Sequence, residues 1–589
     1  MEIGNIEKNN DVVAIEIENL SVWTYEEKSL WQRKVTKPSI RILNNISGRI
    51  KPSEFVAVLG PSGAGKTTLL VSIAGKCRLP RNGTVTVNGE DIRLLDRVVE
   101  IVPQFDIFMP GLSVMEHLIF MTELTVGSCK LKENKKRLQC LLADLKLDKI
   151  SQTNVTDLSG GERRLLSLAT SLLTNPDILV CDEPTTGLDS YNAFIVIGAL
   201  KKLSLYGKVV ICSVHQPSTD LFKAFNSIIL MAEGRLLFHG THEECDELFQ
   251  SINLHCPANY NPADFYIRVL SNLQSSTHVE RILDEYRNRF SMNGVMTKPA
   301  ARTKTKTYKG SWVKEVQLLL WRSSLTLQRD VKEQIIQLFS NIIVTAIVVS
   351  TFFAGVSGTT QRGIQDMSGL LWLMTSETSF IFAYSSLFAF EAELPLFKRE
   401  VGTYSCSSYL ACKFFSCIPR CVVWPMLTVV IMTLFVDLPN HALTSMGFLL
   451  TLIVSGLTAS AYGLGMAALF TSSGLLGDVM PCVDLPLFLM SGVFRRIALM
   501  PIWLHVVRYL SHFYYTMDAM SNIYWRQISH IDCVSNLTGV CDGAAVLAEV
   551  GYSQNFVTQD SLGLLFLVAF WIILAYFGLK REERRGYAY

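Results

Sequence analysis

The stretch that decides the fold is residues 55–74, which read FVAVLGPSGAGKTTLLVSIA. Its apolar run 55–59 predicts a buried strand, and the apolar residues from Leu69 predict a helix after the glycine-rich loop. Glycines let backbone N–H groups approach phosphates, and a helix amino terminus adds partial positive charge. We therefore predict a binding site for a nucleoside triphosphate. The alternative is a tight glycine turn that binds no ligand. The residues assigned to nucleotide binding here are Gly60, Pro61, Ser62, Gly63, Ala64, Gly65, Lys66, Thr67 and Thr68.

A pair of carboxylates follows a second apolar run, at residues 178–183 (ILVCDE). Lys66 would contact the β- and γ-phosphates and the Thr67 hydroxyl would bind Mg²⁺. Asp182 suits the shell of the same Mg²⁺, and Glu183 suits a base that polarises the attacking water. The alternative is an acidic loop after a strand, which leaves the neighbouring motifs unexplained.

Four further polar motifs surround these two. The sequence Leu158-Ser159-Gly160-Gly161-Glu162 precedes an apolar helical pattern and predicts a second phosphate contact at a helix start. Three single residues complete the set: Gln104 after an apolar run, Asp189 after the carboxylates, and His215 after the apolar run 209–213.

In order and spacing, this set resembles the Walker A, Q-loop, signature, Walker B, D-loop and H-loop of an ATP-binding-cassette (ABC) ATPase. The resemblance implies ATP and Mg²⁺ as cofactors, with Gln104 near the metal and His215 at the γ-phosphate. It also implies that two such domains pack head to tail, so that Ser159 and Gly161 of one cap the ATP held by Lys66 of the other. No aromatic residue can be assigned to adenine stacking; the candidates are Trp23, Tyr25 and Trp31.

Charge divides the chain into unlike parts. Residues 1–330 carry 76 charged side chains, whereas residues 331–589 carry 30. We expect an α/β P-loop ATPase domain at 1–270, a linker at 271–310, an amphipathic connecting helix at 311–330 and an all-α membrane domain at 331–589. The hydrophobic content of 49% excludes a disordered chain, and a net charge of +2 gives no support to nucleic-acid binding.

Six transmembrane helices are predicted in the second part, because a helix needs about 20 apolar residues to cross a bilayer. The positions of basic residues place both termini in the cytosol and residues 526–560 on the opposite side. The predicted spans are 334–354, 368–390, 421–436, 444–477, 479–494 and 561–579.

The non-cytosolic loop holds two candidate modification sites. Cys533 and Cys541 can form a disulfide within or between subunits, or remain free thiols, and Asn536 begins an Asn-Leu-Thr glycosylation acceptor.

Ionisable residues inside spans are candidates for substrate contact, and these are Glu377 and Asp484. Each can instead be a hydrated residue near an interface. The aromatic residues Phe380 and Phe382 can line a slot for a flat substrate or pack between helices.

The order of the two parts narrows the resemblance. An ATPase ahead of the membrane domain, together with His215-Gln216-Pro217-Ser218 and residues 261–266 (NPADFY), is similar to G-subfamily half-transporters of the White/Brown/Scarlet type, Brown-type subunits in particular. The chain departs from the group at Cys417 before Ile418-Pro419 and at Phe105 after Gln104.

That resemblance implies a dimer with a White-like partner that moves pteridine or purine pigment precursors. The implied membrane is that of a pigment granule or another lysosome-related organelle, with the plasma membrane as the alternative. A second interpretation is an exporter of lipids, sterols or xenobiotics. A third, of a different class, is a membrane-anchored regulatory scaffold that binds ATP.

Overall fold

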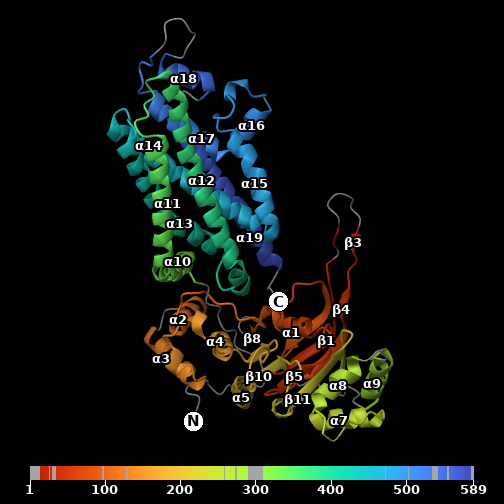
Figure 1. Cartoon of the computed structure of the whole chain (residues 1–589). Helices are drawn as coiled ribbons and strands as arrows, with labels where there is room; N and C mark the ends of the chain where they lie inside the picture. Colours follow the sequence, from red (N-terminus) through yellow and green to blue (C-terminus); the bar gives the residue numbers. More distant parts are fainter. Residues whose placement is uncertain are drawn as a thin grey trace. The chain divides into compact units, whose positions relative to one another are not determined.

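The computed structural model describes residues 13–25, 27–28, 35–95, 98–127, 131–257, 259–271, 275–289, 310–470, 473–501, 503–532, 541–552 and 556–585. They form two compact units, one within residues 1–310 and the other within 311–584 (Figure 1). The first unit is α/β and the second is helical, which confirms the predicted fold class; they are called the ATPase unit and the membrane unit after the domains expected there.

A six-stranded sheet forms the centre of the ATPase unit. Its order is β12-β11-β5-β10-β9-β8, and all neighbours are parallel except β11 and β12. Every residue of β5, β9, β10 and β11 is buried, as expected of a parallel sheet covered on both faces. The strands are β5 (Phe55–Leu59), β8 (Val99–Val102), β9 (Ile178–Cys181), β10 (Val209–Ser213), β11 (Ser227–Ala232) and β12 (Arg235–Gly240).

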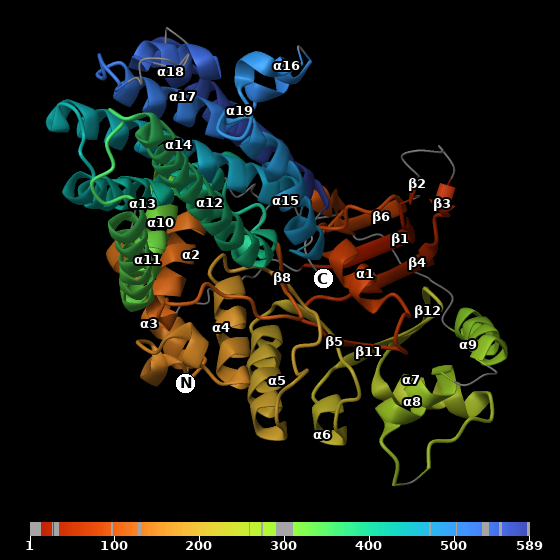
Figure 2. The same ribbon diagram turned by 45° about the horizontal axis from the view of Figure 1, so that its top comes forward.

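A second, antiparallel sheet has the order β4-β1-β6-β7, and α4 and α5 lie next to each other beside the first sheet (Figure 2). The remaining strands are β1 (Ile15–Trp23), β2 (Glu27–Lys28), β3 (Val35–Lys37), β4 (Arg41–Ile50), β6 (Arg81–Val87) and β7 (Glu90–Asp91). The helices of this unit are α1 (Lys66–Ile73), α2 (Val114–Thr125), α3 (Leu131–Asp144), α4 (Gly160–Leu172), α5 (Ser190–Leu205), α6 (Thr219–Phe222), α7 (His242–Ser251), α8 (Pro262–Ser271) and α9 (Ser275–Arg289).

The membrane unit is built from ten helices in the described residues, and α12 packs along α14. Glycines allow this close approach, since a Cβ at Gly463 would lie 2.1 Å from the carbonyl oxygen of Ala383. The helices are α10 (Trp312–Arg329), α11 (Val331–Phe352), α12 (Gln361–Arg399), α13 (Cys406–Phe435), α14 (His441–Leu469), α15 (Ser473–Leu489), α16 (Leu504–Arg508), α17 (His512–Trp525), α18 (Gly543–Val550) and α19 (Phe556–Arg585).

Among the described residues, five helices are long and apolar enough to cross a membrane: α11, α12, α13, α14 and α19. The predicted fifth span, 479–494, corresponds to α15, which has 17 residues, contains Pro481 and Pro486, and ends at Leu489. The chain then forms α16 and the almost entirely buried α17. The predicted outer loop 526–560 also differs, because it contains α18 and the first residues of α19.

Candidate functional site

The glycine-rich loop joins β5 to α1, as the sequence predicts. Gly65 at the amino terminus of α1 has φ of 93°, a left-handed conformation that a glycine adopts without strain. The Lys66 ammonium donates hydrogen bonds to the carbonyl oxygens of Gly60 at 2.8 Å and Pro61 at 3.0 Å. The loop thus folds around the lysine side chain. The N–H groups in the first turn of α1 lie where the loop ends.

Strand order brings the predicted residues to one edge of the sheet. Cys212 of β10 pairs in register with Ala57 of β5 and with Cys181 of β9, and Cys181 also pairs with Val102 of β8. The carboxyl ends of these four parallel strands therefore form one row, which is where α/β folds bind ligands. Gln104, Asp182, Glu183, His215 and the loop 60–68 all follow strands of this row.

The Ser213 hydroxyl links the Asp182 carboxylate to the backbone of Glu183. Ser213 Oγ donates to Asp182 Oδ1 at 2.5 Å and accepts the Glu183 backbone N–H at 2.8 Å. Glu183 Oε2 accepts from Gln104 Nε2 at 2.8 Å and from Thr186 Oγ1 at 2.9 Å. Glu183 has φ of 44°, a left-handed conformation that is uncommon outside glycine and is found at functional sites.

Lys66 and these carboxylates interact electrostatically. Burial lowers the pKa of Lys66, because desolvation disfavours its charged form. The Glu183 and Asp182 carboxylates act in the opposite direction and offset part of this effect. One cation and two anions thus lie together at the edge of the sheet.

The predicted second phosphate contact lies at the start of α4. Ser159 Oγ caps this helix, and Glu162 completes the capping box with the Ser159 backbone N–H at 2.9 Å. Gly161 packs on Asn192, since a Cβ at Gly161 would lie 2.6 Å from Asn192 Cγ. Asn192 in turn donates to Asp189 Oδ1 at 2.5 Å. The structure thereby brings the signature loop together with Asp189.

Sequence reasoning missed one residue of this site, Arg164. Its guanidinium is 4% exposed and donates to the carbonyl oxygens of Asp182 at 2.8 Å and of Glu183 at 3.0 Å. The same group reaches the Gln104 carbonyl at 3.2 Å and Asp106 Oδ1 at 3.0 Å. Arg164 therefore ties α4 to the ends of β8 and β9. Its signal in the sequence is a position four residues before Leu168, on the apolar face of the helix.

Two of the motifs that carry the family resemblance meet near His215. Asn261 Nδ2, just before α8, donates to the carbonyl oxygen of Pro217 at 2.7 Å. His215 itself is exposed. Among the adenine-stacking candidates, the ring of Trp23 faces the Arg41 guanidinium at 5.1 Å, Tyr25 is exposed, and Trp31 lies outside the described residues.

The substrate candidates of the membrane unit have different surroundings. Asp484 in α15 accepts from Tyr384 of α12 at 2.9 Å and from Tyr462 of α14 at 2.5 Å. Glu377 accepts from Thr345 Oγ1 of α11 at 2.7 Å. Both carboxylates are thus held by hydroxyl groups of neighbouring helices.

The two phenylalanine candidates separate. The Phe380 ring lies 6.0 Å from that of Phe488 and 5.3 Å from that of Phe513. Phe382 is 1% exposed and faces α14, where a Cβ at Gly456 would lie 2.9 Å from its ring. Phe382 therefore packs between helices, and Phe380 belongs to an aromatic cluster near Asp484.

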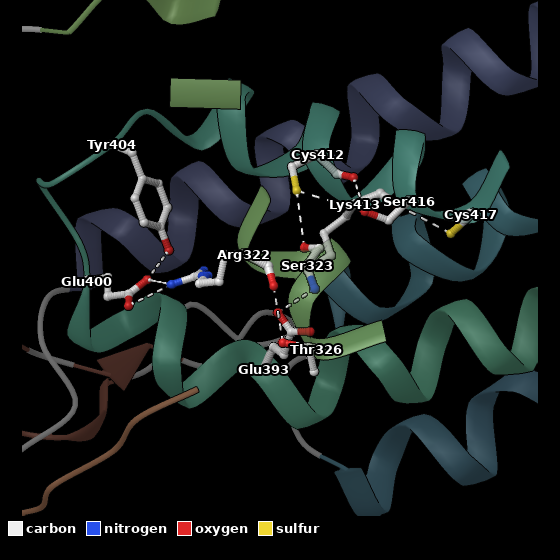
Figure 3. A network of polar contacts seen from close by, with 10 residues as sticks. All are labelled: Arg322, Ser323, Thr326, Glu393, Glu400, Tyr404, Cys412, Lys413, Ser416 and Cys417. Carbon is white, nitrogen blue, oxygen red and sulfur yellow. Dashed lines mark hydrogen bonds and ion pairs between the residues drawn. The ribbon is translucent and has the colours of Figure 1, made fainter. Parts of the chain in front are cut away.

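A polar junction links α10 to the adjoining ends of α12 and α13 (Figure 3). The Arg322 guanidinium bonds both oxygens of Glu400 at 2.9 Å, and Tyr404 donates to Glu400 at 2.7 Å. Lys413 forms an ion pair with Glu393 nearby. Burial lowers the pKa of Arg322, but Glu400, Tyr404 and Glu393 together outweigh this effect and raise it. The sequence does not reveal this junction, because its partners are 78 residues apart.

Cys541 is disulfide-bonded. Its predicted partner Cys533 and the glycosylation candidate Asn536 lie outside the described residues, so the pairing and the modification stay predictions.

Comparison with known proteins agrees with this geometry. A family model described as ABC transporter matches residues 43–186, and one described as ABC-2 type transporter matches residues 314–525. Protein white of Drosophila melanogaster is 32% identical over 94% of this chain and 85% of its own length. Protein brown and protein scarlet of the same species are 30% and 31% identical, over 95% and 92% of this chain and 95% and 87% of their own lengths. Because the three identities are nearly equal, they do not show whether this chain is of the Brown type in particular, as the sequence resemblance predicts. The chain belongs to the White/Brown/Scarlet group of G-type ABC half-transporters, membrane proteins that couple ATP hydrolysis to transport.

Proposed function

We propose that this chain pairs with a second, White-like half-transporter and that the pair moves a small planar or amphipathic substrate, such as a pteridine or guanine pigment precursor. The observation that carries the dimer is the split of the ATP site. Lys66, Asp182, Glu183 and Gln104 converge at the sheet edge. In the described residues, Ser159 and Gly161 contact Glu162 and Asn192 rather than the loop 60–68.

In this proposal each ATP lies between two subunits. Its phosphates contact Lys66 and the α1 amino terminus of one subunit and the Ser159 loop of the other, as expected of a helix start that carries free N–H groups. Glu183 accepts the proton of the attacking water. Gln104 orients the Glu183 carboxylate for this role through its hydrogen bond to Oε2. His215 contacts the γ-phosphate.

Magnesium fits the donors that are present. The Thr67 hydroxyl, the Asp182 carboxylate and the Gln104 side-chain oxygen are hard oxygen ligands, which Mg²⁺ prefers together with phosphate oxygens and water. When bound, the ion neutralises charge that develops on the phosphates. Ser213 fixes the Asp182 carboxylate through Oδ1 and leaves Oδ2 for the ion.

The chemistry around Asp484 supports a planar heterocycle. Phe380, Phe488 and Phe513 offer ring faces for stacking, and Asp484, one turn before Phe488, offers oxygens to N–H donors. Purines and pteridines combine a flat ring with N–H groups. In this proposal both termini are cytosolic, residues 1–270 act as the motor, and the membrane is that of a pigment granule or related organelle.

The test is affinity purification of the full-length chain from its native membrane, followed by transport assays in vesicles. Labelled guanine, a pteridine, tryptophan and a sterol are offered with ATP, and Glu183→Gln is the matched control. We expect co-purification of a White-like chain and ATP-dependent uptake of guanine or pteridine. A chain that purifies only with itself contradicts the heterodimer, and uptake of sterol alone supports the exporter alternative.

A further inference from the structure

Two buried carboxylates lie at the contact between α17 and α19. Asp518 in α17 is fully buried, and Asp560 near the start of α19 is 1% exposed. Gly563 allows the helices to meet, because a Cβ there would lie 2.3 Å from the Tyr515 ring. Asp560 is one turn before Gly563 and Asp518 one turn after Tyr515, so each carboxylate is on the contacting face of its helix. The two carboxylates interact electrostatically.

Their hydrogen bonds are unequal. Asp518 accepts from Asn522 Nδ2 at 2.6 Å and from the Tyr514 hydroxyl at 3.2 Å. Neither side-chain oxygen of Asp560 has a hydrogen-bond partner in the part of the chain that the structure describes. A buried carboxylate without a partner is strongly disfavoured in its ionised form, and a second carboxylate beside it makes this worse. The pair therefore requires a positive charge.

Arg508, the basic side chain that interacts electrostatically with Tyr514 and Tyr515, is engaged elsewhere. Its guanidinium lies 4.8 Å from the ring centre of Tyr509 and 5.3 Å from that of Tyr514, and it donates to the Tyr509 hydroxyl at 2.8 Å. The described residues show no ion pair between Arg508 and Asp560. The other titratable groups that interact with the pair in the described residues are the phenols of Tyr514, Tyr515 and Tyr552.

We propose that Asp560, with Asp518 beside it, forms a monovalent cation site, which holds either a proton on Asp560 or an alkali cation. Carboxylate and phenol oxygens suit both, since a proton on Asp560 removes the like-charge repulsion and a hard cation prefers oxygen ligands. The site is separate from the ATP site and from the cluster around Asp484. It gives the membrane unit an ion dependence of its own, whichever substrate it moves.

The test measures thermal unfolding of the purified full-length chain in detergent, in choline chloride from acidic to alkaline pH and then with sodium or potassium replacing choline at constant ionic strength. If a proton is bound, the folded chain holds a proton that the unfolded chain has lost, so Tm falls as pH rises. If an alkali cation is bound, Tm rises with its concentration at alkaline pH. We expect one of these dependences in the wild type and its loss in Asp560→Asn. Glu549→Gln, which removes a partly exposed carboxylate of the same unit paired with Arg496, should retain it.

Three results overturn the proposal. One is a wild type whose Tm changes with neither pH nor alkali cation in the range where the carboxylates titrate. Another is an Asp560→Asn variant that keeps the full wild-type dependence. The third is that Arg508→Gln lowers Tm and that the added substitution Asp560→Asn restores it, which would identify Arg508 as the counter-ion of Asp560. If Asp560→Asn does not fold, Asp518→Asn takes its place. If neither variant folds, the dependence of the wild-type Tm on pH and on alkali cation decides.

Discussion

The ATPase unit and the membrane unit both bury charged side chains, but they compensate these charges in different ways. In the ATPase unit, Arg164 is neutralised mainly by the carbonyl dipoles of two loops and by Asp106. In the membrane unit, Arg322 is held mainly by a side chain, since both oxygens of Glu400 accept from its Nη1. The first arrangement spreads a charge over the backbone that it positions, and the second concentrates it in one pair of side chains.

This difference predicts where a substitution acts. A charge held by backbone carbonyls fixes the position of those carbonyls, so its removal should affect the reaction that they support. A charge held by one buried partner leaves an uncompensated partner behind, so its removal should affect folding. Four substitutions test this comparison.

The largest effect is expected where a charge takes part in the reaction. Glu183→Gln should reduce the rate of ATP hydrolysis roughly 100- to 10,000-fold, because a positioned general base contributes about this much. Binding of ATP should persist, since Lys66 and the loop 60–68 are unchanged. Phosphate release and nucleotide binding by the reconstituted transporter check this. Unchanged turnover would contradict the assigned role of Glu183.

Next in size is the buried pair of the membrane unit. Arg322→Met should destabilise the unit by about 3–5 kcal/mol, because it leaves Glu400 buried without its partner. The double variant Arg322→Met/Glu400→Leu should recover most of this loss. Thermal unfolding of the full-length chain in detergent measures both. If the double variant is as unstable as the single one, the pair is not the source of the effect.

Arg164→Gln should then lower kcat for ATP hydrolysis by about tenfold or more, since hydrogen bonds from a charged donor are worth about 1.5–3 kcal/mol. KM for ATP should change little, because Arg164 bonds the carbonyls of Asp182 and Glu183 rather than the loop 60–68. Arg164→Lys should restore part of the rate. The neighbouring Arg163→Gln is the control. A change in KM alone would argue against a positioning role.

The smallest effect is expected at an uncharged side chain, which serves as a reference for the three charged ones. Ser113 caps α2 and accepts the Glu116 backbone N–H. Ser113→Ala should cost about 1 kcal/mol of stability, the usual value of a lost N-cap. Hydrolysis per folded molecule should stay at the wild-type level. If Ser113→Ala lost more stability than Arg322→Met, removal of a buried charge would not cost more than removal of a neutral cap, and the comparison would fail.

The convergence of the candidate ATP-site residues follows from the sequence because its geometry is local. A loop between a strand and a helix, or a carboxylate at a strand end, needs only the order of parallel strands to reach the right place. Arg164 escapes this reasoning, because its bonds reach residues 18 to 61 positions away, and its place on the apolar face of α4 does not identify those partners.

The membrane unit is harder to predict, because hydropathy reports length and not contacts. The uncharged run 444–477 conceals the end of α14 at Leu469 and the start of α15. Phe382 and Phe380 are two residues apart, yet one packs on Gly456 and the other joins an aromatic cluster. Asp560 falls within the predicted outer segment 526–560, and the structure places it, buried, near the start of α19.

The length of α15 has a consequence for the lipid around it. Seventeen residues reach about 26 Å at about 1.5 Å per residue, which is less than a hydrocarbon core of about 30 Å. A helix of this length that crosses a bilayer needs either a thinner bilayer beside it or protein-covered backbone to fill the remaining depth. The nearly complete burial of α17 is what such backbone requires. Bilayer thickness therefore bears more directly on α15 than on the 39-residue α12, which has length to spare for tilting.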